Sequence, residues 1–534
     1  MLCAVALVVG SLLHGAALAP AGRLVEVIVR VEAGTSIADA RRTVVALGGQ
    51  VGRPLAIVGG FAAAVPSAAL ARLTASPAVA SVSANYSVQL LHEVNGFDAE
   101  TAAGSMYNVA WQIGAREYWS NGFTGQGIDV AVIDSGVSPV EGLNRDGQVA
   151  HGPDLSFERL NPHLRHLDTY GHGTHMAGII AGRDAGVDQG SLSQEHDRFV
   201  GIAPGARVVS LKVANALGAT DVSQVIAAID WVVTHANDDG LNIRVLNLSF
   251  GTDGRQDYRT DPLTHAVEQA WRAGIFVVVA AGNSGPTAGG LNNPAYDPFV
   301  MAVGADNTRG TKRVSDDVVA SFSSSGDGQR NPDVLAPGRR VVSLRVPGSH
   351  LDNEHPDSRL NERFVPGSGT SQAAAVVSGA AALVLQQRPR LTPDELKQLL
   401  RSTAKRLPDA PESAQGKGLI SLSDAFGAPT PLGYVQTAQP SSGGGSLEAA
   451  RGSIHVVGAD GYVLSGEVGV ETVPHWFVCA TDASLDGNSW SGNSWSGNSW
   501  SGNSWSGGPS TDGNSWSATG WLGVSWGKKP KLGK

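Results

Sequence analysis

Residues 128–136 read Ile-Asp-Val-Ala-Val-Ile-Asp-Ser-Gly, and their pattern indicates the fold class. Its first six residues are mostly Val, Ile and Ala, which is typical of a central strand in a parallel sheet with helices on both faces. Asp134 comes directly after this strand. An acid there either closes a turn or orients a reactive partner, because parallel α/β sheets present their reactive groups where the strands end.

Similar short apolar runs recur along the chain, and segments with helical periodicity lie between them. Further strands are predicted at residues 208–213, 244–249, 275–281 and 299–303, and helices at residues 221–233, 264–273, 370–387 and 393–402. Alternating strands and helices favour a doubly wound α/β domain with a mostly parallel sheet. We assign this domain to residues 93–427.

Composition narrows the class of protein. Only 16% of the 534 residues are charged and the formal net charge is -9, so a nucleic-acid binder, which would carry a basic face, is not expected. The two cysteines are Cys3 and Cys479, and Cys3 lies in an N-terminal apolar run. No disulfide framework is therefore expected in the mature chain.

Three other polar residues stand at boundaries between predicted elements. His172 lies between two glycines at a helix start, Ser371 follows Gly-Ser-Gly-Thr at residues 367–370, and Asn283 follows an apolar strand. Each has a plain structural interpretation, as a packed or exposed imidazole, a helix cap and a turn residue. The functional alternatives are a general base, a nucleophile and an oxyanion donor.

Together these segments resemble the signature blocks of subtilisin-like serine proteases, the peptidase S8 family or subtilases. The blocks are Asp134-Ser-Gly, His172-Gly-Thr-His, Ala-Gly-Asn283 and Gly-Thr-Ser371, and they occur in the chain order that subtilisin has. The resemblance implies a catalytic triad in which Ser371 is the nucleophile, His172 transfers the proton and Asp134 orients His172. It makes Asn283 the oxyanion donor.

The resemblance also implies where substrate binds. Leu248, Ser249, Phe250 and Gly251 are similar to the family's substrate-lining strand, along which an extended peptide forms main-chain hydrogen bonds. The partners implied are protein or peptide substrates. No metal or organic cofactor is needed for catalysis, and structural calcium, which some members of the family bind, has no assigned ligands in this sequence.

One part of the motif departs from the family pattern. Gln372, Ala375 and Val376 stand where the family usually has Met, Pro and His. All three belong to the helix behind Ser371, and the triad itself is complete.

Residues 20–92 read as a small α+β module. Strands are predicted at residues 24–31, 50–58, 61–65 and 79–88, with helices at residues 36–47 and 67–75 that Ser36 and Ser67 should cap. The order βαββαβ is that of a ferredoxin-like module. The resemblance implies a propeptide that acts as an intramolecular inhibitor and is then removed by the enzyme itself; the alternative is a permanent accessory domain.

The two ends of the chain have distinct compositions. Residues 1–19 are largely apolar and end in Ala-Leu-Ala, which predicts a signal peptide and a secreted protein, although no Lys or Arg precedes the apolar run. The alternative is a buried strand or helix. Residues 428–486 are interpreted as a linker and a small β-like segment.

Residues 487–534 form a low-complexity tail in which Asn-Ser-Trp-Ser-Gly recurs. Exposed Trp side chains stack on sugars or pack at interfaces, so the tail is compatible with contact to a cell envelope, and a flexible segment without a ligand is the alternative.

Two functions from different classes fit the sequence. The first is a secreted serine endopeptidase, extracellular or attached to the cell surface, that is made as a self-processing zymogen. The second is a catalytically inactive surface-binding protein with the same fold. The complete triad favours the first.

Overall fold

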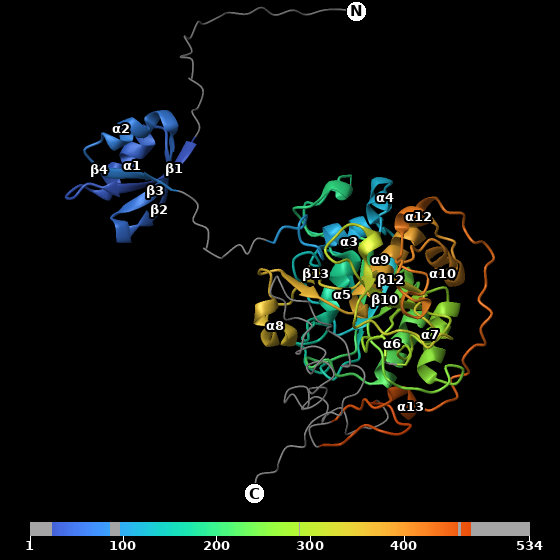
Figure 1. Cartoon of the computed structure of the whole chain (residues 1–534). Coiled ribbons are helices and arrows are strands. Elements are labelled where there is room, and N and C mark those ends of the chain that lie inside the picture. The colour runs from blue at the N-terminus through green and yellow to red at the C-terminus, as the bar shows by residue number, and fades with distance from the viewer. Residues whose placement is uncertain (1–23, 86–96, 189, 288, 458–460, 471–534) are drawn as a thin grey trace, which may run out of the picture. The chain divides into compact units, whose positions relative to one another are not determined.

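The computed structural model describes residues 24–85, 97–188, 190–287, 289–457 and 461–470 (Figure 1). The chain divides into two compact units, residues 1–93 and 94–534. The predicted signal peptide, the repeat tail and both cysteines lie outside the described residues. Within the described part, no helix is both long enough and apolar enough to cross a membrane.

The described part of the first unit, residues 24–85, has four strands and two α-helices. They are β1 (Leu24–Val31), α1 (Ile37–Ala46), β2 (Gln50–Leu55), β3 (Gly60–Pro66), α2 (Leu70–Thr74) and β4 (Val79–Ala84). The strands form an antiparallel sheet in the order β2-β3-β1-β4. Val27, Val29 and Phe61 belong to its buried core, which is separate from that of the second unit.

Two helix caps were predicted in this unit, and one of them is confirmed. Ser36 caps α1, and its hydroxyl accepts a hydrogen bond from the Ala38 N–H at 3.1 Å. Ser67 does not cap α2, so that prediction is wrong. Ser67 instead begins a 3-10 turn in which its carbonyl accepts from the Leu70 N–H, and this turn satisfies the start of the helix without a side-chain acceptor.

The second unit is built on an eight-stranded sheet. The strands are β5 (Asp129–Asp134), β6 (Val149–Asp154), β7 (Arg207–Lys212), β8 (Ile243–Leu248), β9 (Phe276–Ala280), β10 (Met301–Asn307), β11 (Val318–Val319) and β12 (Val334–Pro337). Their order is β11-β10-β9-β8-β5-β7-β6, with β12 also beside β10. Only the pairing of β10 with β11 is antiparallel. The predicted mostly parallel sheet is confirmed.

Helices surround this sheet (Figure 1). The longer ones are α5 (His172–Ala181), α6 (Val222–Thr234), α7 (Pro262–Arg272), α9 (Thr370–Gln387) and α10 (Pro393–Ser402). The shorter helices are α3 (Met106–Gln112), α4 (Ala115–Ser120), α8 (His350–Glu354), α11 (Glu412–Gln415), α12 (Leu422–Gly427) and α13 (Leu447–Arg451). Two further strands, β13 (Val341–Leu344) and β14 (Phe364–Gly367), pair with each other in an antiparallel two-stranded sheet.

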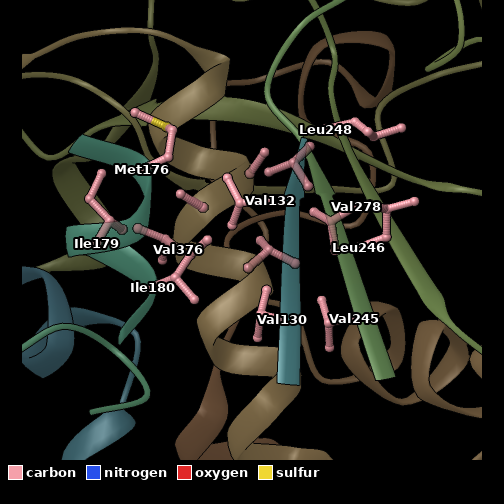
Figure 2. Packing of buried hydrophobic residues seen from close by; sticks show 14 of the residues in the cluster. Val130, Val132, Met176, Ile179, Ile180, Val245, Leu246, Leu248, Val278 and Val376 are labelled. Carbon is pink, nitrogen blue, oxygen red and sulfur yellow. The ribbon is translucent and has the colours of Figure 1, made fainter. Parts of the chain in front are cut away.

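Helix α9 lies in the core of the second unit. Its first sixteen residues, Thr370 to Leu385, are all buried, and most are Ala, Gly, Ser or Val. Small side chains allow the helix to pack closely against β8, β9 and β10. Figure 2 shows Val376 of α9 next to Ile179 and Ile180 of α5 and beside β5. This packing fixes where α5 and α9 begin.

The described residues after α12 pack against the rest of the second unit. Residues 446–457 and 461–470, here called the C-terminal clasp, contain α13 and an isolated β-bridge between Val457 and Val463 but no strand. The predicted small β-like segment continues to residue 486, outside the described residues. In the part that is described, Ile454, Val456 and Leu464 are buried in the core of the second unit.

Candidate active site

The carboxyl ends of β5, β8 and β9 lie side by side. Leu248 of β8 is opposite Ile133 of β5 and Val279 of β9. Parallel neighbours are separated by about 4.8 Å, so residues at the ends of these strands share one edge of the sheet. Asp134 closes β5 and Ser249 directly follows β8.

His172 is the first residue of α5 and is fully buried. Its Nδ1 lies 2.8 Å from Oδ1 and 2.9 Å from Oδ2 of Asp134. Gly173 permits this approach, because a Cβ there would lie 2.2 Å from the carbonyl oxygen of Gly136. A carboxylate facing Nδ1 favours the tautomer in which Nε2 can accept a proton.

Asp168, which the sequence pattern did not single out, holds this pair of residues in place. Its Oδ1 accepts hydrogen bonds from Ser135 Oγ at 2.8 Å and from the Gly171 N–H at 2.6 Å, and its Oδ2 accepts from the Thr174 N–H at 2.8 Å. Burial raises the pKa of the Asp168 carboxyl, and these hydrogen bonds oppose that shift. An acid shortly before a helix start was the available signal.

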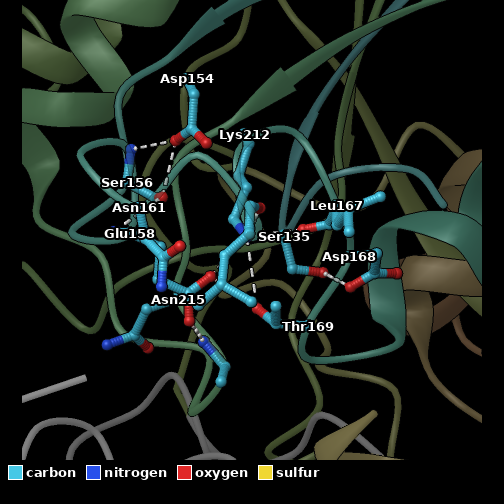
Figure 3. A network of polar contacts seen from close by, with 12 residues as sticks. Ser135, Asp154, Ser156, Glu158, Asn161, Leu167, Asp168, Thr169, Lys212 and Asn215 are labelled. Atoms are coloured by element: carbon cyan, nitrogen blue, oxygen red, sulfur yellow. Dashed lines mark hydrogen bonds and ion pairs between the residues drawn. The ribbon is translucent and has the colours of Figure 1, made fainter. Parts of the chain in front are cut away.

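A buried ion pair fixes the loop that leads into α5 (Figure 3). Lys212, the last residue of β7, places its Nζ 2.5 Å from Glu158 Oε2 and donates to the Leu167 carbonyl at 2.5 Å. Thr169 Oγ1 donates to the same Glu158 oxygen at 2.7 Å. Leu167 and Thr169 come just before His172, so the Lys212–Glu158 ion pair helps to fix the position of the candidate base. No sequence pattern predicted this ion pair.

Ser371 is the second residue of α9 and is buried. Its Oγ donates to the Ser249 carbonyl at 2.9 Å, and Ser249 Oγ donates to the Ser371 carbonyl at 3.1 Å. The start of α9 is therefore bonded in both directions to the residue after β8. Because β8 pairs with β5, which ends in Asp134, the structure brings Ser371 to the edge where the His172–Asp134 pair lies.

Asn283 follows β9 and contacts the start of α9. Its Oδ1 accepts hydrogen bonds from the N–H of Thr370 at 2.8 Å and from Thr370 Oγ1 at 3.0 Å. Its Nδ2 makes no hydrogen bond within the described part of the chain and is left as a donor. The first N–H groups of a helix also lack intrahelical partners. Two such donors beside a hydroxyl can bind a developing oxyanion.

The four residues predicted to line the substrate form one continuous stretch. Leu248 ends β8, and Ser249, Phe250 and Gly251 follow it, all buried. The next residue, Thr252, forms an antiparallel bridge with Asn293. The stretch therefore connects the residue that is bonded to Ser371 with the Thr252–Asn293 bridge.

Two further residues near the site have different characters. His175 is fully buried and its Nε2 lies 3.2 Å from the Val365 carbonyl; burial, and then the nearby His172, lower its pKa to about 3, so it is a neutral packing residue. Gln372 is fully buried, and neither carboxamide atom has a hydrogen-bond partner among the described residues.

Metal ligands are a separate question. In the portion of the chain that the structure describes, no group of three or more His, Cys, Asp or Glu side chains is gathered around a metal-sized site. Calcium ligands stay unassigned.

Comparison with known proteins identifies the family. A model of the subtilase family matches residues 125–418. The chain belongs to the subtilase family. This subtilase is 37% identical to serine protease AprX of Bacillus subtilis (strain 168) over 319 residues, which cover 58% of the chain and 69% of the relative. It is 31% identical to subtilisin E of the same organism over 381 residues, 71% of the chain and 83% of the relative.

A third relative is matched over almost its whole length. Subtilisin Savinase of Lederbergia lenta is 33% identical over 321 residues, which are 60% of this subtilase and 98% of the relative. The chain is therefore a serine-type endopeptidase of the subtilisin type, and the prediction of its family and activity is confirmed.

Proposed function

We propose that this subtilase hydrolyses peptide bonds in proteins through an acyl-enzyme formed on Ser371. Ser371 Oγ attacks the carbonyl carbon while His172 Nε2 takes its proton, and Asp134 stabilises the imidazolium that forms. The observation that carries the proposal is the contact of His172 Nδ1 with both Asp134 oxygens, at 2.8 and 2.9 Å. A serine hydroxyl is a weak nucleophile without such an adjacent base.

The tetrahedral intermediate carries its negative charge beside α9. Asn283 Nδ2 and the Ser371 N–H are the proposed donors to that oxygen. When the intermediate collapses, the carbon–nitrogen bond breaks and His172 gives its proton to the leaving amine. Water then attacks the acyl-enzyme with the same base and releases the second product. The proposed chemistry uses no metal or organic cofactor.

The resting serine must change its hydrogen bond to react. Ser371 Oγ donates to the Ser249 carbonyl at 2.9 Å, and rotation about the Cα–Cβ bond redirects the hydroxyl toward His172. A substrate strand pairing along Leu248, Ser249, Phe250 and Gly251 engages the main chain at that place. Binding of substrate and activation of the nucleophile are in this way linked at Ser249.

An activity-based probe tests the triad. A fluorophosphonate should label the mature enzyme on Ser371, and Ser371→Ala should abolish labelling. Ser378→Ala is the matched control, because Ser378 lies on the same helix and donates to Asn247 Oδ1 at 2.9 Å. Mature enzyme that takes no label would overturn the proposal and favour an inactive surface-binding protein.

We also propose that residues 20–92 are a ferredoxin-like propeptide that the enzyme removes itself. Support comes from the antiparallel β2-β3-β1-β4 sheet with two helices in the first unit. In purified Ser371→Ala protein the precursor should persist, and added wild-type enzyme should cut it. Loss of the N-terminal segment from the variant alone would mean that another protease processes the chain, or that the bond is not a self-cleavage site.

Export is the last part of the proposal. Residues 1–19 have the composition of a signal peptide, and a relative 30% identical over 309 residues is named minor extracellular protease Epr. We propose that the enzyme acts outside the cell and that the Trp-rich tail, residues 487–534, contacts the cell envelope. Sedimentation with isolated envelope polysaccharide, with and without the tail, tests that contact.

A further inference from the structure

The C-terminal clasp is attached beside the proposed substrate strand. Thr252 Oγ1 donates to the Ala450 carbonyl at 2.5 Å, and the Ser453 N–H donates to Asp253 Oδ1 at 2.7 Å. Thr252 and Asp253 directly continue the substrate-lining stretch that ends at Gly251. The clasp therefore contacts the chain directly after that stretch, although the two segments are about two hundred residues apart in sequence.

Backbones pack against each other at this junction. A Cβ on Gly254 would lie 2.4 Å from the Ala450 carbonyl oxygen, and a Cβ on Gly452, whose φ is +68°, would lie 2.5 Å from the Gly254 nitrogen. Such contacts leave no room for a side chain between the segments. The clasp is closely fitted to the peptidase unit at this point.

Arg451 holds the clasp in a defined position. Its side chain is 1% exposed, and its Nε donates to Asp221 Oδ1 at 2.7 Å. The same guanidinium donates to the carbonyls of Gly466 at 2.5 Å and Val468 at 2.6 Å. Asp221 also caps α6. A buried cation with this many partners ties both ends of the clasp to one helix.

This attachment places Ile454 in the wall of a small pocket of about 10 Å³ next to Phe250. Ile454 and Arg451 line the same small pocket as Val222, Val225 and Phe250. Phe250 belongs to the proposed substrate strand, and Ile454 is only 4% exposed. The side chains of Val222, Val225, Phe250 and Ile454 form its apolar walls, and its polar lining consists of Thr220, Thr252 and the Arg451–Asp221 ion pair.

We propose that the clasp limits the substrate side chain accepted beside Phe250, and that Ile454 is the specificity-determining residue. The inference rests on the proposed function, in which an extended peptide lies along residues 248–251. A peptide paired along residues 248–251 passes Phe250, and alternate side chains of an extended strand point to the same side, so one of its side chains faces this pocket. Ile454 occupies its end, so the enzyme prefers small apolar side chains there over aromatic ones.

Peptide cleavage measures this preference directly. Libraries that vary each of the four positions on either side of the scissile bond identify the responsive position. At that position, Ile454→Ala should raise the kcat/KM ratio of Phe over Ala substrates by about tenfold or more, because it removes several carbon atoms from the pocket wall. Ile454→Phe should lower the ratio. Ile454→Val should raise the ratio by less than Ile454→Ala does. The valine variant replaces the alanine variant in the test if the latter does not fold.

Leu464→Ala is the matched control. Leu464 is a fully buried clasp residue that does not line the pocket, so its truncation should leave the ratio unchanged. An equal fall in kcat/KM for all substrates in both variants, with fluorophosphonate labelling intact, would mean that the clasp only stabilises the fold and would overturn the inference alone. Absence of labelling and of cleavage in the wild type would overturn the proposed function, and this inference with it.

Discussion

Gln372, the residue after the proposed nucleophile, carries a buried amide without hydrogen-bond partners among the described residues. An unsatisfied buried polar group costs about 1–3 kcal/mol, whereas an apolar side chain of the same shape avoids that cost. The family pattern has Met at this position. Gln372 in place of Met therefore lowers the stability of the fold where α9 is buried, and it leaves the contacts of the triad residues unchanged.

Gln372→Met should accordingly stabilise the protein by about 1–3 kcal/mol. Urea unfolding in the Ser371→Ala background, where self-digestion is absent, measures the change. Gln386→Met is the control on the same helix, because Gln386 Oε1 accepts hydrogen bonds from the N–H groups of Thr124 and Gly125, both at 2.7 Å. The control should destabilise. If both substitutions destabilise alike, the Gln372 amide has a partner.

Asn283 acts on the transition state in the proposed mechanism, so its loss should lower kcat more than it changes KM. We expect Asn283→Ala to reduce kcat by roughly 10²–10³, a range that comes from the corresponding donor in a subtilisin itself. Thr370→Val, which removes one of the two groups bonded to Asn283 Oδ1, should cost less. Steady-state kinetics decide; an increase in KM at constant kcat would place Asn283 in ground-state binding instead.

At the scale of elements, the starts of α5 and α9 determine the site, and buried polar groups hold them. The loop before α5 depends on the Lys212–Glu158 pair, whose side chains are 0% and 2% exposed. A buried charge is tolerated when an opposite charge lies beside it. If one partner is removed, the remaining charge stays buried without compensation and destabilises the fold.

Lys212→Met should therefore destabilise the protein by about 3–5 kcal/mol, since it leaves the Glu158 carboxylate uncompensated. Combining it with Glu158→Gln, which removes that charge, should recover part of the loss. A double-mutant cycle by chemical unfolding measures the coupling. Strictly additive effects would mean that the two charges do not stabilise each other.

At the scale of the whole second unit, one buried acid makes stability depend on pH. Asp297 is fully buried, and burial raises its pKa from 3.8 to about 8. The folded protein thus holds a proton that the unfolded chain releases near pH 4. The contribution of this group to stability is present below that pH and is lost as the pH rises toward 8.

Replacement of Asp297 by Asn should remove this dependence. The free energy of unfolding of the wild type should fall relative to that of Asp297→Asn between about pH 4 and pH 8, by up to about 1.4 kcal/mol per pH unit. Denaturant unfolding of both proteins across that range provides the test. His175, whose pKa is lowered to about 3, changes stability in both proteins equally and cancels in the difference. A constant difference would contradict the shift.

The family, the serine endopeptidase activity, the mostly parallel sheet and most element positions could be predicted from the amino-acid sequence alone. These depend on local signals: apolar periodicity along each strand and helix, and motifs such as the one around Ser371. The roles of Asp134, His172, Ser371 and Asn283 stay predictions, although the structure brings His172 to Asp134 and Ser371 to the end of the adjacent strand.

The surroundings of those residues depend on the tertiary structure. The Ser135–Asp168 hydrogen bond, the Lys212–Glu158 pair and the placement of Ile454 beside Phe250 all join segments that no local pattern relates. Arg451 and Asp221 are 230 residues apart, and each alone reads as an ordinary polar residue. Their partnership depends on how the chain after α12 returns to the sheet, because the energy of a buried charge depends on which groups folding brings next to it.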